Sequence, residues 1–87
     1  MTGTAKVVVD TVLAVVHLRD PDAREVRLDH DLADDLKLAS LDLAELGATL
    51  EVELGHPVFE GVAMQGFVTV GDLVAHCEEV IARDHAR

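Results

Sequence analysis

Apolar residues recur at intervals of three and four along three separate stretches of this 87-residue chain, and this spacing constrains the fold most strongly. In an α-helix such positions share one face, whereas a strand buries alternate residues. The valines at 7–9 also suit a strand, but no second alternating segment exists to pair with them. We therefore expect helices over about residues 4–17, 40–54 and from 69 onward. Their inward faces comprise Val8, Val12, Val15 and Val16 in the first, Leu43, Leu46, Leu50 and Leu54 in the second, and Val70, Leu73, Val74, Cys77, Val80 and Ile81 in the third.

Residues that start or stop helices stand at the ends of these stretches. A cap at Thr4 is predicted for the first helix, and the Asp-Pro-Asp sequence at 20–22 ends it, because proline disfavours helix continuation. Gly55 followed by Pro57 is a typical end for the second helix. The last helix begins at Thr69, which forms a capping-box pattern with the acid three residues later.

Two connections join the three predicted helices. The first, residues 22–39, is long and acidic, and a loop of this length in a small domain is usually functional or held by apolar anchors. In the second connection a short helical turn is expected at 59–64, ended by Gly66. The sequence thus predicts a single all-α domain over residues 1–87, a small four-helix bundle of three main helices and one short one. The expected anchors of the first connection are Val26, Leu28, Leu32 and Leu36.

A chain of this size has little room for an internal active site. Only about 60–65% of its unfolded surface is buried on folding, and with two Phe and no Trp or Tyr the core must be aliphatic. No serine–base–oxyanion set of the kind a nucleophilic enzyme needs is recognisable. The five histidines show no close pair at metal-ligand spacing, and the one cysteine adds little. We expect no catalytic residue and no metal site.

The charge of the chain indicates which partners it can have. Seventeen acidic against seven basic residues give a net charge of −10, which repels nucleic acid and anionic lipid and favours basic protein surfaces. The longest apolar run, residues 12–16, is too short to span a membrane, and the first four residues lack a signal-peptide pattern. The lone Cys77 fits a reducing compartment. We expect a cytoplasmic monomer that binds neither nucleic acid nor membrane.

Ser40 opens the second predicted helix and is the only serine in the chain. On the same side of that helix runs an apolar strip, which is separate from the inward leucines and edged by carboxylates. No Lys or Arg occurs from residue 38 to 82. Such a surface suits docking to a basic, partly apolar partner. The strip comprises Leu41, Ala44, Ala48 and Val52, with Glu45 and Glu51 at its margins.

Both features have a simpler interpretation. On spacing alone, Ser40 is better explained as the N-cap of its helix, a position that favours serine, and the strip as an ordinary solvated face. A helix N-terminus also favours a phosphate group through its free N–H groups and dipole, so a phosphodiester on Ser40 would be accommodated there. The residue pattern by itself leaves these alternatives open.

The sequence around Ser40 resembles the phosphopantetheine attachment region of acyl carrier proteins, which typically reads D-L-G-x-D-S-L-D-x-V-E-L. The resemblance extends upstream to Glu25-Val26 and Leu32, and downstream to residues 67–73, which are similar to the family's I-T-T-V-G-D segment. It covers nearly the whole chain. The matching stretch reads Asp35-Leu36-Lys37-Leu38-Ala39-Ser40-Leu41-Asp42-Leu43-Ala44-Glu45-Leu46.

The resemblance implies a carrier and not an enzyme. Ser40 would receive 4′-phosphopantetheine, derived from coenzyme A, from a phosphopantetheinyl transferase, and the thiol of the arm would carry acyl groups. An acyltransferase, a ketosynthase or an adenylating enzyme with a basic docking surface would then act on the cargo. Partner enzymes would recognise the helix that begins at Ser40, through Leu41, Asp42, Glu45, Ala48 and Glu51.

Two departures from the family pattern bear on the pathway. Ala39 replaces the Asp of the D-S-L triplet, and Lys37 replaces the usual Gly. The altered triplet favours polyketide or related secondary-metabolite (antibiotic-type) biosynthesis over fatty-acid biosynthesis. An aminoacyl or starter-unit carrier of a hybrid polyketide–nonribosomal peptide pathway and a housekeeping fatty-acid carrier are the alternatives within the class. The alternative from another class is an unmodified acidic helical adaptor, against which the lone serine at the helix start argues.

Overall fold

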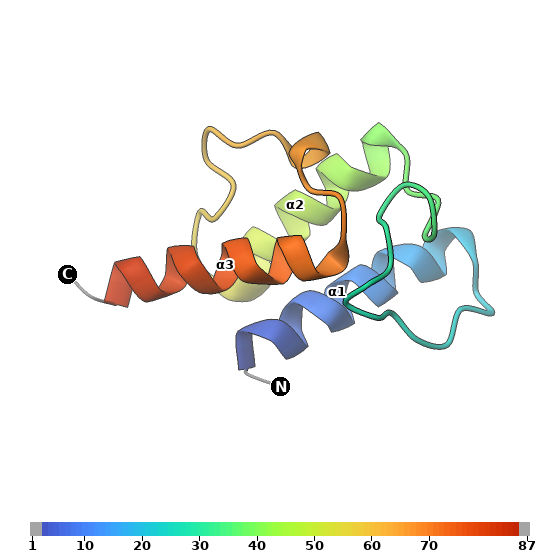
Figure 1. Cartoon of the computed structure of the whole chain (residues 1–87), viewed down its shortest axis with the longest axis horizontal. Helices are drawn as coiled ribbons and strands as arrows, with labels where there is room; N and C mark the ends of the chain where they lie inside the picture. Colours follow the sequence, from blue (N-terminus) through green and yellow to red (C-terminus); the bar gives the residue numbers. More distant parts are fainter. Residues whose placement is uncertain (1–2, 86–87) are drawn as a thin grey trace.

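Three α-helices and one 3-10 turn make up the computed structural model, which describes residues 3–85 (Figure 1). They are α1 (Gly3–Arg19), α2 (Ser40–Leu54), η1 (Met64–Gly66) and α3 (Val70–His85). This order confirms the predicted all-α bundle of three main helices and one short helix. Met1 and Thr2, which belong to the start assessed for a signal peptide, lie outside the described residues, as do the last two residues of the predicted domain.

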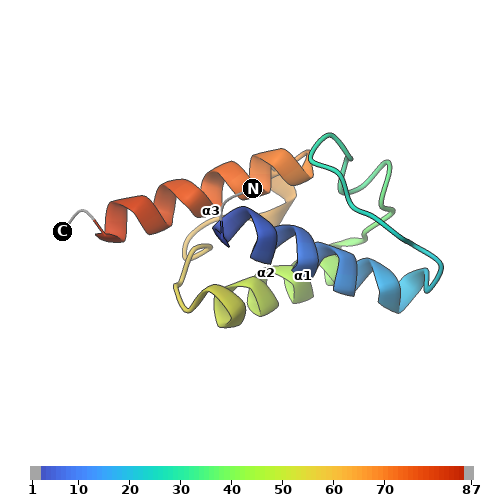
Figure 2. The ribbon, with the colours of Figure 1, turned by 90° about the horizontal axis from the view of Figure 1, so that it is seen from below.

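Helix α1 is the central element, because it packs against both α2 and α3, while η1 packs on α2 (Figures 1 and 2). The aliphatic core between them contains the predicted inward faces. Leu54, Val80 and Ile81 lie at its edge and are only partly buried. None of the helices within residues 3–85 is both long enough and apolar enough to cross a membrane. Among the hydrophobic core residues of the described part of the chain, those with no exposed surface are Val8, Val12, Leu46, Leu50, Val70, Leu73 and Cys77.

The first helix differs from its predicted bounds at both ends. Gly3 is already helical, so the predicted cap at Thr4 is wrong, because Thr4 lies inside the first turn. The helix also extends two residues beyond position 17, to Arg19, since the Asp20 N–H still donates to the Val16 carbonyl at 2.8 Å. The chain then turns at Pro21, as expected.

The predicted signals at the other helix ends are confirmed. Gly55 adopts φ +70°, a left-handed conformation that glycine tolerates, and its N–H donates to the Glu51 carbonyl at 2.9 Å. At the start of α3 the Asp72 N–H donates to the Thr69 hydroxyl, and the Thr69 N–H donates to the Asp72 carboxylate, both at 3.1 Å. These reciprocal bonds form the capping box, so Asp serves here in place of the usual Glu.

The short helix was predicted at residues 59–64, which is wrong, because the 3-10 turn lies at 64–66. Phe59 is buried in the core, and Gly61 turns the chain with φ +74°, so this segment cannot continue as a helix. The later turn places Met64 directly on α2. A Cβ at Gly47 would lie 3.1 Å from the Met64 sulfur, which explains a glycine in the middle of α2.

The connection between α1 and α2 is held by apolar side chains and by backbone pairing. Val26 and Leu32 are buried and Leu36 is partly buried, as predicted, but Leu28 is 47% exposed and Leu38, which was not predicted as an anchor, is buried. Leu28 holds the connection through its backbone and not through its side chain, since its carbonyl accepts the Gly71 N–H at 2.8 Å.

Backbone hydrogen bonds join this connection to the start of α3. The Leu32 N–H donates to the Val68 carbonyl at 2.9 Å, and the Val70 N–H donates to the His30 carbonyl at 3.0 Å, around an isolated bridge between Asp31 and Thr69. We call residues 28–32 and 68–71 the paired loops. Their hydrogen bonds hold these two segments side by side, although the segments are distant in sequence.

Cys77 is expected to be inert toward thiol reagents in the folded protein. It has no exposed surface, and burial, with a smaller contribution from Glu78, raises the pKa of its thiol to about 11. At pH 8 only about one thiol in a thousand would be ionised, and the thiolate is the reactive form. Maleimide should therefore leave the native unmodified protein unlabelled over an hour, and should label it fully in 6 M guanidinium. Rapid native labelling would contradict the packing of α3.

Candidate functional site

Ser40 is the first residue of α2, and its side chain is exposed. The N-cap of the helix is Ala39, with φ −85° and ψ 173°, so the simpler interpretation of Ser40 as the cap is wrong. Asp42, the third residue of the helix, makes the reciprocal half of a capping box by accepting the Ala39 N–H at 2.8 Å. Within residues 3–85 the Ser40 hydroxyl makes no hydrogen bond. It therefore has no structural task and is available for chemistry.

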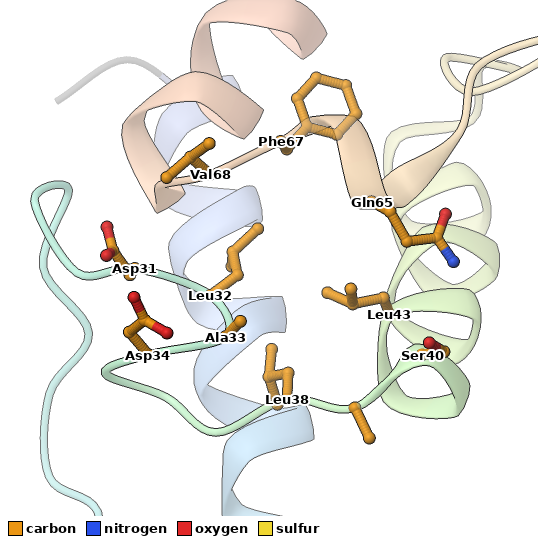
Figure 3. A pocket seen from close by; sticks show the side chains of 11 residues that line it. Asp31, Leu32, Ala33, Asp34, Leu38, Ser40, Leu43, Gln65, Phe67 and Val68 are labelled. Atoms are coloured by element: carbon orange, nitrogen blue, oxygen red, sulfur yellow. The ribbon is translucent and has the colours of Figure 1, made fainter.

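A cavity of about 510 Å³ opens beside Ser40 (Figure 3). Leu32 and Leu38 from the first connection lie across the opening from Leu43 and Ser40 of α2, and Phe67 closes one end. The buried leucines make the interior apolar, and the polar lining groups belong to exposed or half-exposed residues. The complete lining is Asp31, Leu32, Ala33, Asp34, Leu38, Ala39, Ser40, Leu43, Gln65, Phe67 and Val68.

Sequence reasoning missed this cavity and the contributions of Gln65, Phe67 and Val68 to it. No local pattern carries the information, because the walls come from residues 31–39 and 65–68, which only the paired loops bring together.

Polar contacts from α1 hold the junction that leads into Ser40. Arg19 forms an ion pair with Asp42 and also donates to the Lys37 carbonyl at 3.4 Å. The Ala39 N–H, followed by the Arg19 guanidinium, lowers the pKa of Asp42 below its ordinary value. Lys37 has φ +59°, a left-handed conformation that costs a residue with a Cβ about 1–2 kcal/mol. This conformation explains why the family pattern that the chain resembles has glycine there.

The predicted docking residues divide into two groups. The strip is exposed as expected: Leu41 and Val52 are each 79% exposed, and Ala44, Ala48 and Glu45 are exposed beside them. The other two carboxylates are engaged within the chain. Asp42 binds Arg19 and the Ala39 N–H, and Glu51 accepts the Phe59 N–H at 3.0 Å. Docking itself stays a prediction for all seven residues.

The residues around Ser40 fit a covalent phosphopantetheine. The hydroxyl is exposed, and the first N–H groups of α2 lack helical carbonyl partners, so they favour a phosphodiester. Ala39 contributes no negative charge, and Arg19 offsets that of Asp42. No group of three or more His, Cys, Asp or Glu residues in the described part of the chain is arranged to hold a metal ion.

Comparison with known protein families identifies the same chemistry. The family model described as a phosphopantetheine attachment site matches residues 6–77, which is most of the chain and includes Ser40. No curated protein and no solved structure matches the chain significantly. Members of this family are carrier domains that attach 4′-phosphopantetheine covalently and do not themselves catalyse reactions. The chain therefore belongs to the phosphopantetheine attachment family and is a carrier protein.

Proposed function

We propose that Ser40 is the attachment residue, and that the protein carries intermediates of polyketide or related secondary-metabolite biosynthesis. The thiol at the end of the bound arm holds such acyl groups as thioesters. The observation that carries the proposal is the exposed, unbonded hydroxyl of the only serine, placed at the mouth of an apolar cavity. Family membership favours this carrier over an unmodified adaptor.

The nucleophile of the loading reaction is the Ser40 hydroxyl. The Ser40 oxygen attacks the phosphorus of coenzyme A that bears the pantetheine group, the pyrophosphate bond breaks, and adenosine 3′,5′-bisphosphate leaves. The hydroxyl proton passes to a base of the transferase, since no side chain within residues 3–85 hydrogen-bonds Ser40. The N-terminal turn of α2 favours the resulting negative charge.

The cavity beside Ser40 gives an aliphatic cargo a place out of water. Its volume of about 510 Å³ lies within the usual range for small-molecule sites, and its interior is formed by Leu32, Leu38, Leu43 and Phe67. Burying alkyl carbons there gains about 0.8 kcal/mol per CH₂ group. A short polar cargo would gain little from this interior.

The departures from the family pattern near the attachment residue support the proposed pathway. Ala39 lines the cavity mouth where the family pattern has Asp, and Lys37 stands where it has Gly. This altered junction supports a carrier with its own dedicated enzymes in secondary metabolism. An aminoacyl group, a starter unit or a fatty-acyl chain found on the arm would change the proposed pathway.

Intact-mass analysis of protein purified from its native host tests the proposal directly. We expect the mass of one phosphopantetheine plus a polyketide-type acyl group. An aminoacyl group or a long saturated chain on the arm would change the pathway, while an unmodified chain would contradict the attachment. Trypsin leaves residues 38–83 as one long peptide because no Lys or Arg occurs from 38 to 82, so a protease that cuts at Glu is needed to isolate Ser40.

We propose further that residues 1–87 form one monomeric carrier domain in the cytoplasm. The net charge of −10 and the unpaired, buried Cys77 support this. Its partners would be a phosphopantetheinyl transferase and an acyltransferase, ketosynthase or adenylating enzyme. Their basic surfaces would dock on the exposed strip that follows Ser40.

Reversing the charge of Glu45 is expected to slow the association of a partner enzyme about three- to tenfold at low salt. Glu45 is exposed at the margin of the strip, and such charges steer encounter with a basic surface. Glu79→Lys, a reversal at an exposed position on α3, is the matched control and should have little effect. Loading rates at 20 mM and 300 mM salt measure this, and the difference should shrink at high salt.

Equal slowing by both reversals would assign the effect to net charge and contradict docking on α2. Glu51 is left out of the test because its carboxylate binds the Phe59 N–H, so its reversal would also disturb the loop.

A further inference from the structure

Polar contacts reach the chain on both sides of Ser40, and one arginine from a different helix makes two of them. Arg19, the last residue of α1, donates through Nη1 to the Asp42 carboxylate and to the Lys37 carbonyl. The same Asp42 oxygen accepts the Ala39 N–H at 2.8 Å. Asp42 lies two residues after Ser40 and Lys37 three before it. The carboxyl end of α1 and the start of α2 lie at the same end of the molecule (Figures 1 and 2).

The position of the Ser40 hydroxyl depends on this junction and on the backbone of α2. The Ser40 side chain is exposed and makes no hydrogen bond within residues 3–85. The place of its hydroxyl relative to a docked enzyme is therefore set by the backbone alone. A misplacement of about 1 Å between reacting groups can slow a reaction about 100-fold.

The cation that pairs with Asp42 at this junction comes from α1. No Lys or Arg occurs from residue 38 to 82, so α2 cannot supply one. The side chains of Arg19 and Asp42 are 48% and 20% exposed. Ion pairs that are this accessible to water contribute little to global stability. Loss of Arg19 should therefore loosen the junction without unfolding the protein.

We infer that Arg19 is a positioning residue for phosphopantetheine transfer, which holds the Lys37–Asp42 junction so that the Ser40 hydroxyl meets the reacting phosphate. This inference rests on the proposed attachment at Ser40. Arg19 does not touch the reacting atoms, and its hydrogen bonds go to Lys37 and Asp42 and not to the exposed strip on α2. Loss of Arg19 should therefore lower kcat for phosphopantetheine transfer and leave KM nearly unchanged.

The test uses the unmodified protein, coenzyme A and a broad-specificity phosphopantetheinyl transferase. Arg19→Ala should lower kcat about tenfold, change KM less than about threefold, and shift the thermal midpoint by less than about 5 °C. Arg19→Lys should recover much of the rate. Arg24→Ala removes the same charge from an exposed residue whose side chain makes no hydrogen bond or ion pair within residues 3–85, and it should leave kcat unchanged. A kcat for Arg19→Ala within twofold of wild type would overturn the inference.

A double-mutant cycle identifies the contact responsible. Asp42→Asn should reproduce the loss in kcat, and the Arg19→Ala/Asp42→Asn pair should be no slower than either single variant. Losses that multiply, or that fall on KM, would overturn the inference, because they would indicate that Arg19 contacts the enzyme itself.

A second readout is independent of modification. The Leu38 and Ala39 amides, which donate to the Leu32 carbonyl and the Asp42 carboxylate, should exchange with solvent at least about threefold faster in unmodified Arg19→Ala than in wild type. Unchanged exchange would refute the positioning role. Failure of wild type to accept phosphopantetheine would instead refute the attachment at Ser40, so the two proposals can fail separately.

Discussion

Ser40→Ala is expected to abolish phosphopantetheine incorporation completely, whereas wild type accepts one group per chain. The change removes the nucleophilic oxygen and leaves the fold intact, because the Ser40 hydroxyl makes no hydrogen bond within residues 3–85 and the N-cap is Ala39. Alanine also favours a helix at this position. Intact mass after incubation with coenzyme A and a broad-specificity transferase measures incorporation, and circular dichroism confirms that the helices remain.

Thr49→Ala is the matched control, since it removes a hydroxyl from the same helix. The Thr49 hydroxyl donates to the Glu45 carbonyl at 2.8 Å and so has a structural partner. This variant should be modified at the wild-type rate to within about twofold. Incorporation that survives in Ser40→Ala would show that the attachment residue has been misassigned.

Leu46→Ala is expected to lower the free energy of unfolding by roughly 2–5 kcal/mol, because it removes a fully buried side chain and leaves a cavity. A domain of 87 residues has a total stability of about 4–13 kcal/mol, so the loss is a large fraction. Leu50→Ala should cost a similar amount, since Leu50 also has no exposed surface. Urea titrations followed by circular dichroism give both values.

Leu41→Ala makes the same leucine-to-alanine change at an exposed position of the same helix. Leu41 is 79% exposed, so its loss should alter the free energy of unfolding by less than about 0.5 kcal/mol. The contrast between Leu41 and Leu46 tests which face of α2 is inward. Equal effects at the two positions would mean that the inward face has been misassigned.

The sequence was sufficient to predict α2 and the start of α3. Both have apolar residues at helical spacing and explicit end signals, Gly55 and the Thr69–Asp72 box, and such local signals act without tertiary help. The start of α1 and the short helix were misplaced. In the segment before η1, the burial of Phe59 and the contact of Met64 with Gly47 decide the structure, and neither is visible in local spacing.

The candidate site was predictable only in part, for the same reason. Ser40 and the exposed strip follow from residue pattern and resemblance. The cavity, the engagement of Glu51 and the ion pair of Asp42 with Arg19 depend on segments that are not adjacent in sequence, such as Leu32 and Val68 in the paired loops, which are 36 residues apart. Contacts of this kind leave no periodic signal in a single sequence.

The paired loops also determine how the cavity can deform. Their backbone hydrogen bonds, from Leu32 to Val68 and from Val70 to His30, join two of the three walls into one stiff unit. The third wall is the first turn of α2, which faces that unit across the opening without such bonds. We therefore expect a cargo too large for the cavity to displace the first turn of α2 outward, while the paired loops stay in place. Because Ser40 is in that first turn, a larger cargo should shift the position of Ser40 itself.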